Sequence, residues 1–264
     1  MPKQTGFIKI KGTLNGVCYY PLKGAYIYRT AVGPSKERIY NDPAFKPVKA
    51  NLLEFGGASK LAKAICTGLK QNVAAFKDSY MTSRLSGCCR KIIQKGSGEP
   101  GQREANLFNQ PELLIGFQLN KTKVFSQIYT VKPIITSNTA RSVVNISIPK
   151  SDKYHLKQAP KTATHFRLTA ALSIVSNYKW SDTVQGYQPQ HPNSNGLGVT
   201  SQSSPLLCKI EHQNIYLQLI NPISTGIPAN TAITVWLGIQ YGNMVQNEFS
   251  PFKTAQAMAC VAVL

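Results

Sequence analysis

Acidic side chains are scarce in this chain, whose 264 residues include only 11 Asp and Glu against 30 Lys and Arg. The formal net charge is +19, and it is unevenly spread, because residues 1–103 carry 18 of the basic and five of the acidic side chains. Such a field attracts nucleic acid, an anionic membrane surface or an acidic protein, and it opposes packing of identical subunits unless a polyanion neutralises it. Charge alone does not choose among these partners.

Signatures of catalysis are also missing. No two carboxylates recur in a pattern typical of a general acid and a general base. The chain has no G-x-S-x-G elbow, no H-E-x-x-H sequence and no Walker lysine. The run Gly96-Ser97-Gly98 precedes no Lys-Ser/Thr pair, and we interpret it as part of a linker. We therefore predict a protein that is not an enzyme and needs no cofactor, with a site built from residues distant in sequence as the open alternative.

The six cysteines and four histidines show no metal-binding spacing. No C-x-x-C pair occurs, and no two histidines stand at the i, i+4 spacing that lets them share a metal on a helix. We expect the cysteines to be reduced and mostly buried thiols, and we predict no metal site.

Long apolar runs are absent as well. No stretch of about eighteen apolar residues occurs. Met1-Pro2-Lys3-Gln4 precedes an alternating pattern instead of the apolar segment of a secretory signal. We therefore expect a soluble, cytoplasmic protein without an integral membrane segment, and its 42% apolar content permits a core.

Residues 6–30 have the pattern of three short strands joined by two tight turns. The stretch from Phe7 to Leu14 alternates apolar and basic side chains, and Asn15-Gly16 supplies the two positive-φ residues that a type I′ turn requires. A second reversal at Lys23-Gly24 separates a strand over 17–22 from a strand over 25–29. A meander of this size buries too little apolar surface to stand alone, and its two open edges offer unpaired backbone groups.

We predict that this meander takes part in a contact between subunits, with an ordinary hairpin sheet resting on the following helices as the alternative. Basic side chains interleave with aromatic ones, as in a stacking platform with a basic rim. The residues predicted at the subunit contact are Phe7, Ile8, Ile10, Tyr19, Tyr20, Tyr26 and Tyr28. The residues predicted to bind a polyanion are Lys9, Lys11, Lys23 and Arg29.

Two helices are predicted after the meander. Asn41-Asp42-Pro43 combines a capping residue with a proline at the first helical position, so the first helix should begin there. The second is expected after Asn72 and should end near Lys95-Gly96. Apolar residues at spacings of three and four define the buried face of the first helix: Val48, Leu52, Phe55, Ala58, Ala62, Ile65 and Leu69. The expected buried stripe of the second comprises Phe76, Tyr80 or Met81, Leu85, Cys88 and Ile92.

The clearest loop, 96–106, separates this part from a region of strand patterns. We place the domain boundary there, with the meander and helices in 1–105 and a β-domain in 106–264. Seven or eight strands with turn signals between them favour an antiparallel, immunoglobulin-like β-sandwich, so the predicted class is α+β. A long surface loop is expected over 182–204. The expected strands are 113–119, 123–136, 142–148, 165–178, 206–211, 215–221, 232–241 and 255–264.

Five stretches carry a resemblance to a known family: GFIKIKGTLNG (6–16), SKERIYNDPAF (35–45), NLLEFGGASKLAK (51–63), ATHFRL (163–168) and WLGIQYG (236–242). In the same order, and over nearly its whole length, the chain resembles a family of uncharacterised proteins common in the Bacteroidota. It is also similar to the subunits of bacterial cytoplasmic fibrils and tubular, rhapidosome-like particles. The resemblance implies self-assembly into a filament, with no catalytic residues to transfer.

We therefore expect a structural protein whose subunits polymerise through a heterologous contact, which repeats indefinitely when its rotation does not close. One alternative is a nucleic-acid-binding or nucleoid-associated module that uses the same cationic face. Another is a tube or sheath component of a phage-like injection particle. Nucleic-acid binding should weaken steeply with added salt, whereas an apolar contact between subunits should survive it.

Overall fold

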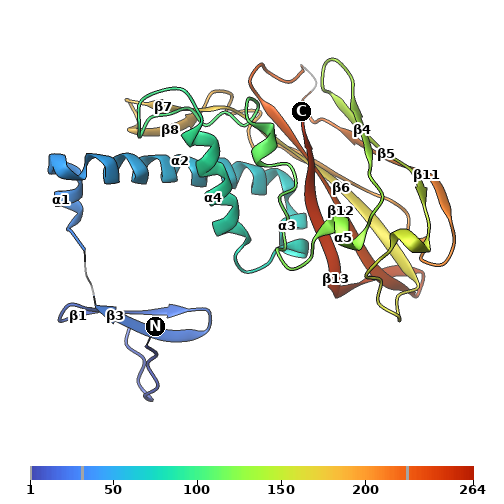
Figure 1. Cartoon of the computed structure of the whole chain (residues 1–264), viewed down its shortest axis with the longest axis horizontal. Helices are drawn as coiled ribbons and strands as arrows, with labels where there is room; N and C mark the ends of the chain where they lie inside the picture. Colours follow the sequence, from blue (N-terminus) through green and yellow to red (C-terminus); the bar gives the residue numbers. More distant parts are fainter. Residues whose placement is uncertain (1, 31–32, 224–225) are drawn as a thin grey trace. The chain divides into compact units, whose positions relative to one another are not determined.

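The computed structural model describes residues 2–30, 33–223 and 226–264. The chain forms two compact units, residues 1–49 and residues 50–264, and helix α2 (Lys46–Leu69) begins in the first and continues into the second. The predicted α+β class is confirmed, because a three-stranded meander precedes helices and antiparallel sheets (Figure 1).

The meander consists of β1 (Gly12–Leu14), β2 (Val17–Leu22) and β3 (Ala25–Thr30), paired in the order β1-β2-β3. Both predicted turns are confirmed. Asn15 and Gly16 have φ values of 46° and 75°, and Lys23 and Gly24 have 50° and 78°. All four lie in the left-handed region that a type I′ turn needs.

The first strand is shorter than predicted, and one edge that we expected to be open is partly paired. Gly12 has a φ of 121°, which ends the extended run, so the residues from Phe7 to Lys11 lie outside the strand. The chain before them returns along β3, where the amide of Gln4 donates to the Tyr26 carbonyl at 2.8 Å. The Gln4 side chain also accepts a bond from the Ile10 amide at 2.8 Å, which closes the intervening loop.

The first helix begins as predicted. Asp42 caps the short 3₁₀ helix η1 (Pro43–Phe45) by accepting from the Ala44 amide at 3.0 Å, and η1 leads directly into α2. A further helix precedes it that the sequence analysis missed. This is α1 (Lys36–Asn41), whose cap Ser35 accepts from the Arg38 amide. No residue of α1 is buried, so its sequence lacks the apolar periodicity that predicts a helix.

Among its described residues, the second unit contains three further α-helices, α3 (Gln71–Phe76), α4 (Met81–Gln94) and α5 (Phe125–Ile128), and the 3₁₀ helices η2 (Pro111–Leu113) and η3 (Lys153–His155). The single helix predicted after Asn72 is therefore two helices. Of the two alternatives predicted for its buried stripe, Met81 is buried and Tyr80 is exposed. Cys89 is buried, whereas the predicted Cys88 is only half-buried. The predicted end at Lys95-Gly96 is confirmed, since α4 has its C-cap at Lys95.

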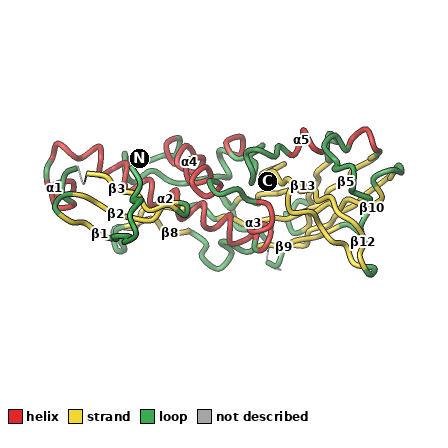
Figure 2. Tube along the Cα trace, turned by 90° about the horizontal axis from the view of Figure 1, so that it is seen from below, coloured by secondary structure: helices red, strands yellow, loops and turns green. Residues whose placement is uncertain are grey.

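The strands of the second unit form two facing sheets and a hairpin. The central sheet has the order β10-β6-β12-β13, with β9 also paired to β6; the outer sheet has the order β11-β5-β4, and β7 pairs with β8. Figure 2 shows β5, β10, β12 and β13 gathered together, with α3 beside them. The bounds are β4 (Ile134–Ser137), β5 (Val143–Ser151), β6 (His165–Val175), β7 (Tyr178–Ser181), β8 (Gly186–Pro189), β9 (Gly198–Gln202), β10 (Leu206–Leu207), β11 (His212–Ile220), β12 (Ala232–Val245) and β13 (Glu248–Val263).

The central sheet is covered on both faces. Alternate residues of β12 enter different cores: Trp236 packs in a cluster with the helices, whereas Val235 and Leu237 pack in a cluster with the outer sheet. The layers are therefore helices, central sheet and outer sheet. Because α2, α4 and the central sheet share one core, the predicted boundary after residue 105 falls inside the second unit.

Four parts of the strand prediction need correction. Of the expected strand 206–211, only Leu206 and Leu207 form a strand, β10. Residues 113–119 form no named strand, although the Leu119 amide donates to the Met258 carbonyl at 2.9 Å along the edge of β13. The stretch 123–136 holds α5 and the start of β4 instead of one strand. The segment 182–204, expected as a loop, contains two strands: β8 forms a hairpin with β7, and β9 pairs with β6, about 30 residues earlier in the chain. The Gln, Asn, Pro and Gly content of this segment masked both strands.

The segment interpreted as a linker is folded against α2. Glu54 of α2 is 2% exposed, and its carboxylate accepts from the Gly101 amide at 2.9 Å and from Arg103 Nη1 at 3.3 Å. Gly101 has a φ of 98°, and a Cβ built there would lie 3.0 Å from the Cα of Ala50. Glycine is therefore required by close packing at this position, and chain flexibility is not its role.

We predict that Glu54→Gln lowers the free energy of unfolding by about 2 kcal/mol, because it removes the buried charge that Arg103 pairs with while keeping an oxygen for the Gly101 amide. Urea unfolding measures the change. Glu99→Gln, at an exposed position of the same loop, is the matched control and should shift stability by less than about 0.5 kcal/mol. Equal stability of the two variants would contradict the assigned role of Glu54.

Candidate subunit interface

Three tyrosines share one face of the meander. The register pairs Tyr19 with Tyr28 and Pro21 with Tyr26, which brings the three phenol rings to the same side. The rings of Tyr19 and Tyr28 lie with their centroids 6.0 Å apart. Tyr20 lies on the opposite face, where the guanidinium of Arg29 stands 5.7 Å from its ring. The predicted contact residues are thus divided between two faces.

The first unit has almost no core. Ile27, at 3% exposure, is the single buried side chain among its described residues, 2–30 and 33–49. Phe7 is fully exposed and Ile8 is 80% exposed, and the side chains of Ile10, Tyr26 and Tyr28 are also exposed. Tyr19 and Tyr20 are partly exposed. One buried side chain offsets little of the conformational entropy that is lost when this segment is ordered.

A second exposed apolar surface lies on α2, and sequence reasoning assigned it wrongly. Of the face predicted to be buried, Val48, Leu52 and Phe55 are 41%, 47% and 50% exposed, and burial starts only at Ala58. The spacing of these residues places them along one stripe of the helix. Periodicity identified the stripe, but it cannot distinguish a face that packs within the subunit from one that is left open.

The four predicted polyanion-binding residues have different surroundings. The ammonium group of Lys9 donates to the carbonyls of Gln4 and Gly6 at 2.5 and 2.7 Å, so it stabilises the loop before β1. Arg29 stacks on Tyr20, Lys11 is exposed, and Lys23 occupies a turn. The Lys9 side chain therefore bonds within its own loop, and the Arg29 side chain lies against an aromatic ring.

Basic charge in the first unit is largely uncompensated. Residues 1–49 contain nine Lys and Arg against two acidic side chains. Among the residues described there, one ion pair forms, between Arg38 and Asp42 at 3.4 Å. Lys36 and Lys49 both lie over the ring of Tyr40, at 5.9 and 5.3 Å from its centroid. In this unit, where carboxylates are few, these lysines make cation–π contacts with an aromatic ring.

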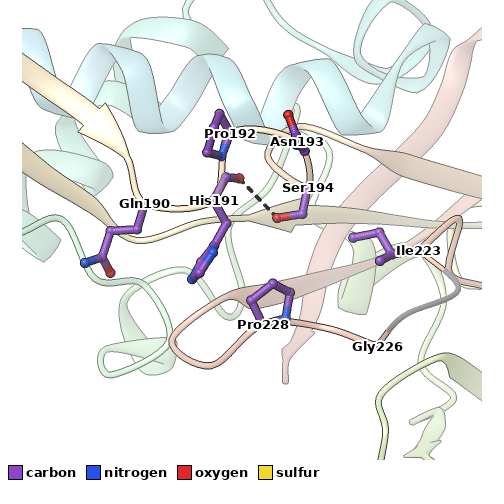
Figure 3. A pocket seen from close by; sticks show the side chains of 8 residues that line it. All are labelled: Gln190, His191, Pro192, Asn193, Ser194, Ile223, Gly226 and Pro228. Carbon is purple, nitrogen blue, oxygen red and sulfur yellow. Dashed lines mark hydrogen bonds between the residues drawn. The ribbon is translucent and has the colours of Figure 1, made fainter.

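A hollow of about 280 Å³ lies between the loop after β8 and the loop before β12 (Figure 3). His191 is the one histidine in its lining, and no acidic side chain accompanies it. The hydroxyl of Ser194 donates to the main-chain carbonyl of His191 at 3.1 Å, and this bond supplies no general base. The hollow therefore shows no nucleophile paired with a base.

In the described ranges, no group of three or more His, Cys, Asp and Glu side chains is placed to hold a metal ion. None of the helices that the structure describes is both long and apolar enough to cross a membrane.

The cysteines are free thiols, and three of them are deeply buried. Cys89, Cys208 and Cys260 are buried, and the other three are half-buried. Burial raises the pKa of the Cys208 thiol to about 11 and also raises the pKa values of the Cys89 and Cys260 thiols. A raised pKa lowers the thiolate fraction at neutral pH, and the thiolate is the nucleophile and the metal ligand.

No protein-family model, no curated protein sequence and no solved structure matches this chain. The similarity to fibril subunits therefore stays an interpretation of the sequence.

Proposed function

We propose that this protein is a structural subunit that assembles into a cytoplasmic filament, fibril or tube, with the meander of one subunit packing on another. The observation that supports this most is the exposure of Phe7, Ile8 and the tyrosine face on a unit with one buried side chain. Covering a large apolar side chain contributes about 2 kcal/mol. Several such side chains supply a contact strong enough to outweigh the repulsion between basic subunits at moderate salt.

Heterologous contact fits the chain better than a symmetric one. The apolar stripe of α2, formed by Val48, Leu52 and Phe55, differs in shape and chemistry from the strand face that carries Tyr19, Tyr26 and Tyr28. We propose that these two surfaces meet between neighbouring subunits. A contact between two unlike surfaces leaves one of each free at the ends, so growth continues unless the rotation closes a ring.

Binding of a nucleic acid or another polyanion is the second candidate. The excess of basic side chains in residues 1–49 and their stacking on aromatic rings favour it. This activity would use the same unit, so the two candidates compete for one surface or act together, with the polyanion neutralising the assembled subunits.

A salt series separates the candidates. We expect the fraction of full-length protein that sediments as polymer to stay constant or to rise between about 0.05 M and about 0.5 M sodium chloride, because salt screens the repulsion between subunits and leaves the apolar contact intact. A gel-shift series with double-stranded DNA runs beside it as the comparison. Loss of sedimentation in parallel with loss of the shift would contradict apolar assembly and favour the nucleic-acid candidate.

A further inference from the structure

Three lysines line a hollow of about 470 Å³ in the second unit. Lys77 follows the end of α3, Lys123 lies in the loop before α5, and Lys253 is on β13. Lys77 and Lys253 are exposed and Lys123 is half-buried. The hollow lies wholly within residues 50–264 and includes none of the lysines that the sequence analysis assigned to polyanion binding.

No carboxylate neutralises this group of lysines. The lining contains no Asp or Glu, and within the described part of the chain none of the three lysines forms an ion pair. Asp78 is next to Lys77 in the chain, but its carboxylate pairs with Arg84 at 2.9 Å and accepts from the Lys121 amide at 2.8 Å. Like charges gathered in a concavity focus a positive potential there.

Neutral donors complete the lining. The Asn120 Oδ1 atom accepts from the amide and the hydroxyl of Thr122 at 3.0 and 2.8 Å, which leaves the amide nitrogen of Asn120 as the donor for a ligand. Thr254 adds a hydroxyl. Gln256 lines the hollow with a side chain that is held in place at both ends: its amide nitrogen donates to the Ala75 carbonyl, and its oxygen accepts from Gln240. Ammonium, amide and hydroxyl donors around one hollow are the groups that phosphate oxygens bind.

We propose that this hollow is a binding site for phosphate groups, and that a compact, multiply charged polyphosphate is its ligand. Three ammonium groups carry three positive charges, which favours a ligand with several negative charges over one with a single carboxylate. The size of the hollow falls in the range of small-ligand sites, which favours a compact anion. This proposal does not rest on filament assembly, since it concerns a different surface and a soluble ligand.

Titration of the full-length protein with inorganic tripolyphosphate, followed by calorimetry, tests the site. We expect saturable binding that becomes weaker by about tenfold or more in the variant Lys77→Gln, Lys123→Gln, Lys253→Gln. The matched control is Lys157→Gln, Lys161→Gln, Lys209→Gln, which removes the same charge at exposed positions outside the hollow. The control should bind as the unsubstituted protein does.

Lysine acetylation of the unsubstituted protein gives a second readout that needs no variant. Tripolyphosphate should protect Lys77, Lys123 and Lys253 and leave Lys157, Lys161 and Lys209 unprotected. Three results would overturn the proposal: equal weakening of binding in both triple variants, unchanged binding in the Lys77, Lys123 and Lys253 variant, or equal protection of all six lysines. Each would mean that the anion does not bind at this hollow in particular. A parallel arm with a short single-stranded oligonucleotide distinguishes the sources: a selective loss there as well identifies phosphodiester groups, and a loss with tripolyphosphate alone identifies a free polyphosphate.

Discussion

Removal of residues 1–30 is expected to convert the assembled protein into a soluble monomer. The deletion takes away the tyrosine face and the exposed Phe7 and Ile8, and it leaves the second unit whole. Both hydrophobic clusters of that unit consist of residues from Ala58 onward, so the remaining chain keeps every side chain of its core. Sedimentation velocity should show one species with the mass of a single truncated chain.

Substitutions in the full-length chain provide the control for this deletion. Changing Tyr19, Tyr26 and Tyr28 to Ser should reduce assembly strongly, because it removes the aromatic surface and keeps the backbone of the meander. Changing Tyr154 and Tyr216, which are exposed on the second unit, to Ser should leave assembly unchanged. Long filaments from the truncated protein under the electron microscope would refute the role assigned to the meander.

Trp236→Ala is expected to lower the free energy of unfolding of the second unit by about 4 kcal/mol. The indole is fully buried between the central sheet and the helices, and its ring lies edge-on to Phe117 with the centroids 6.2 Å apart. Its Nε1 donates to the Thr234 hydroxyl at 3.0 Å. The substitution opens a large cavity and breaks this bond, and urea unfolding monitored by circular dichroism measures the loss.

Val245→Ala is the matched control for this substitution, since Val245 ends the same strand and is exposed. Its effect should stay below about 0.5 kcal/mol. A loss of less than about 1 kcal/mol in Trp236→Ala would contradict the packing of the helices on the central sheet, because that packing is what surrounds the indole.

Local chemistry predicted much of this fold. Asn15-Gly16 and Lys23-Gly24 determine both turns of the meander through their positive φ values. Asp42 and Pro43 mark the start of η1, which leads into α2, by their capping geometry. The apolar runs of β6 and β12 identify strands buried on both faces. In each case the decisive interaction lies within a few residues, which is why the sequence displays it.

The parts that could not be predicted depend on contacts between residues far apart in the chain. Glu54 is buried because Gly101 and Arg103 bond to it from 47 and 49 positions along the chain. The loop that carries these two residues has the composition of a linker, so its sequence does not reveal this contact. The stripe of Val48, Leu52 and Phe55 has the period of a buried face, and only the tertiary structure leaves it exposed. The lysine hollow likewise joins a helix end, a loop and a strand that no spacing connects.

Negative-stain electron microscopy of the purified full-length protein at moderate concentration tests the central claim most directly. If the exposed meander packs on neighbouring subunits, the micrographs will show filaments, fibrils or tubes of uniform width. Single particles with the dimensions of one chain, at every ionic strength and concentration and with or without added polyanion, would contradict it.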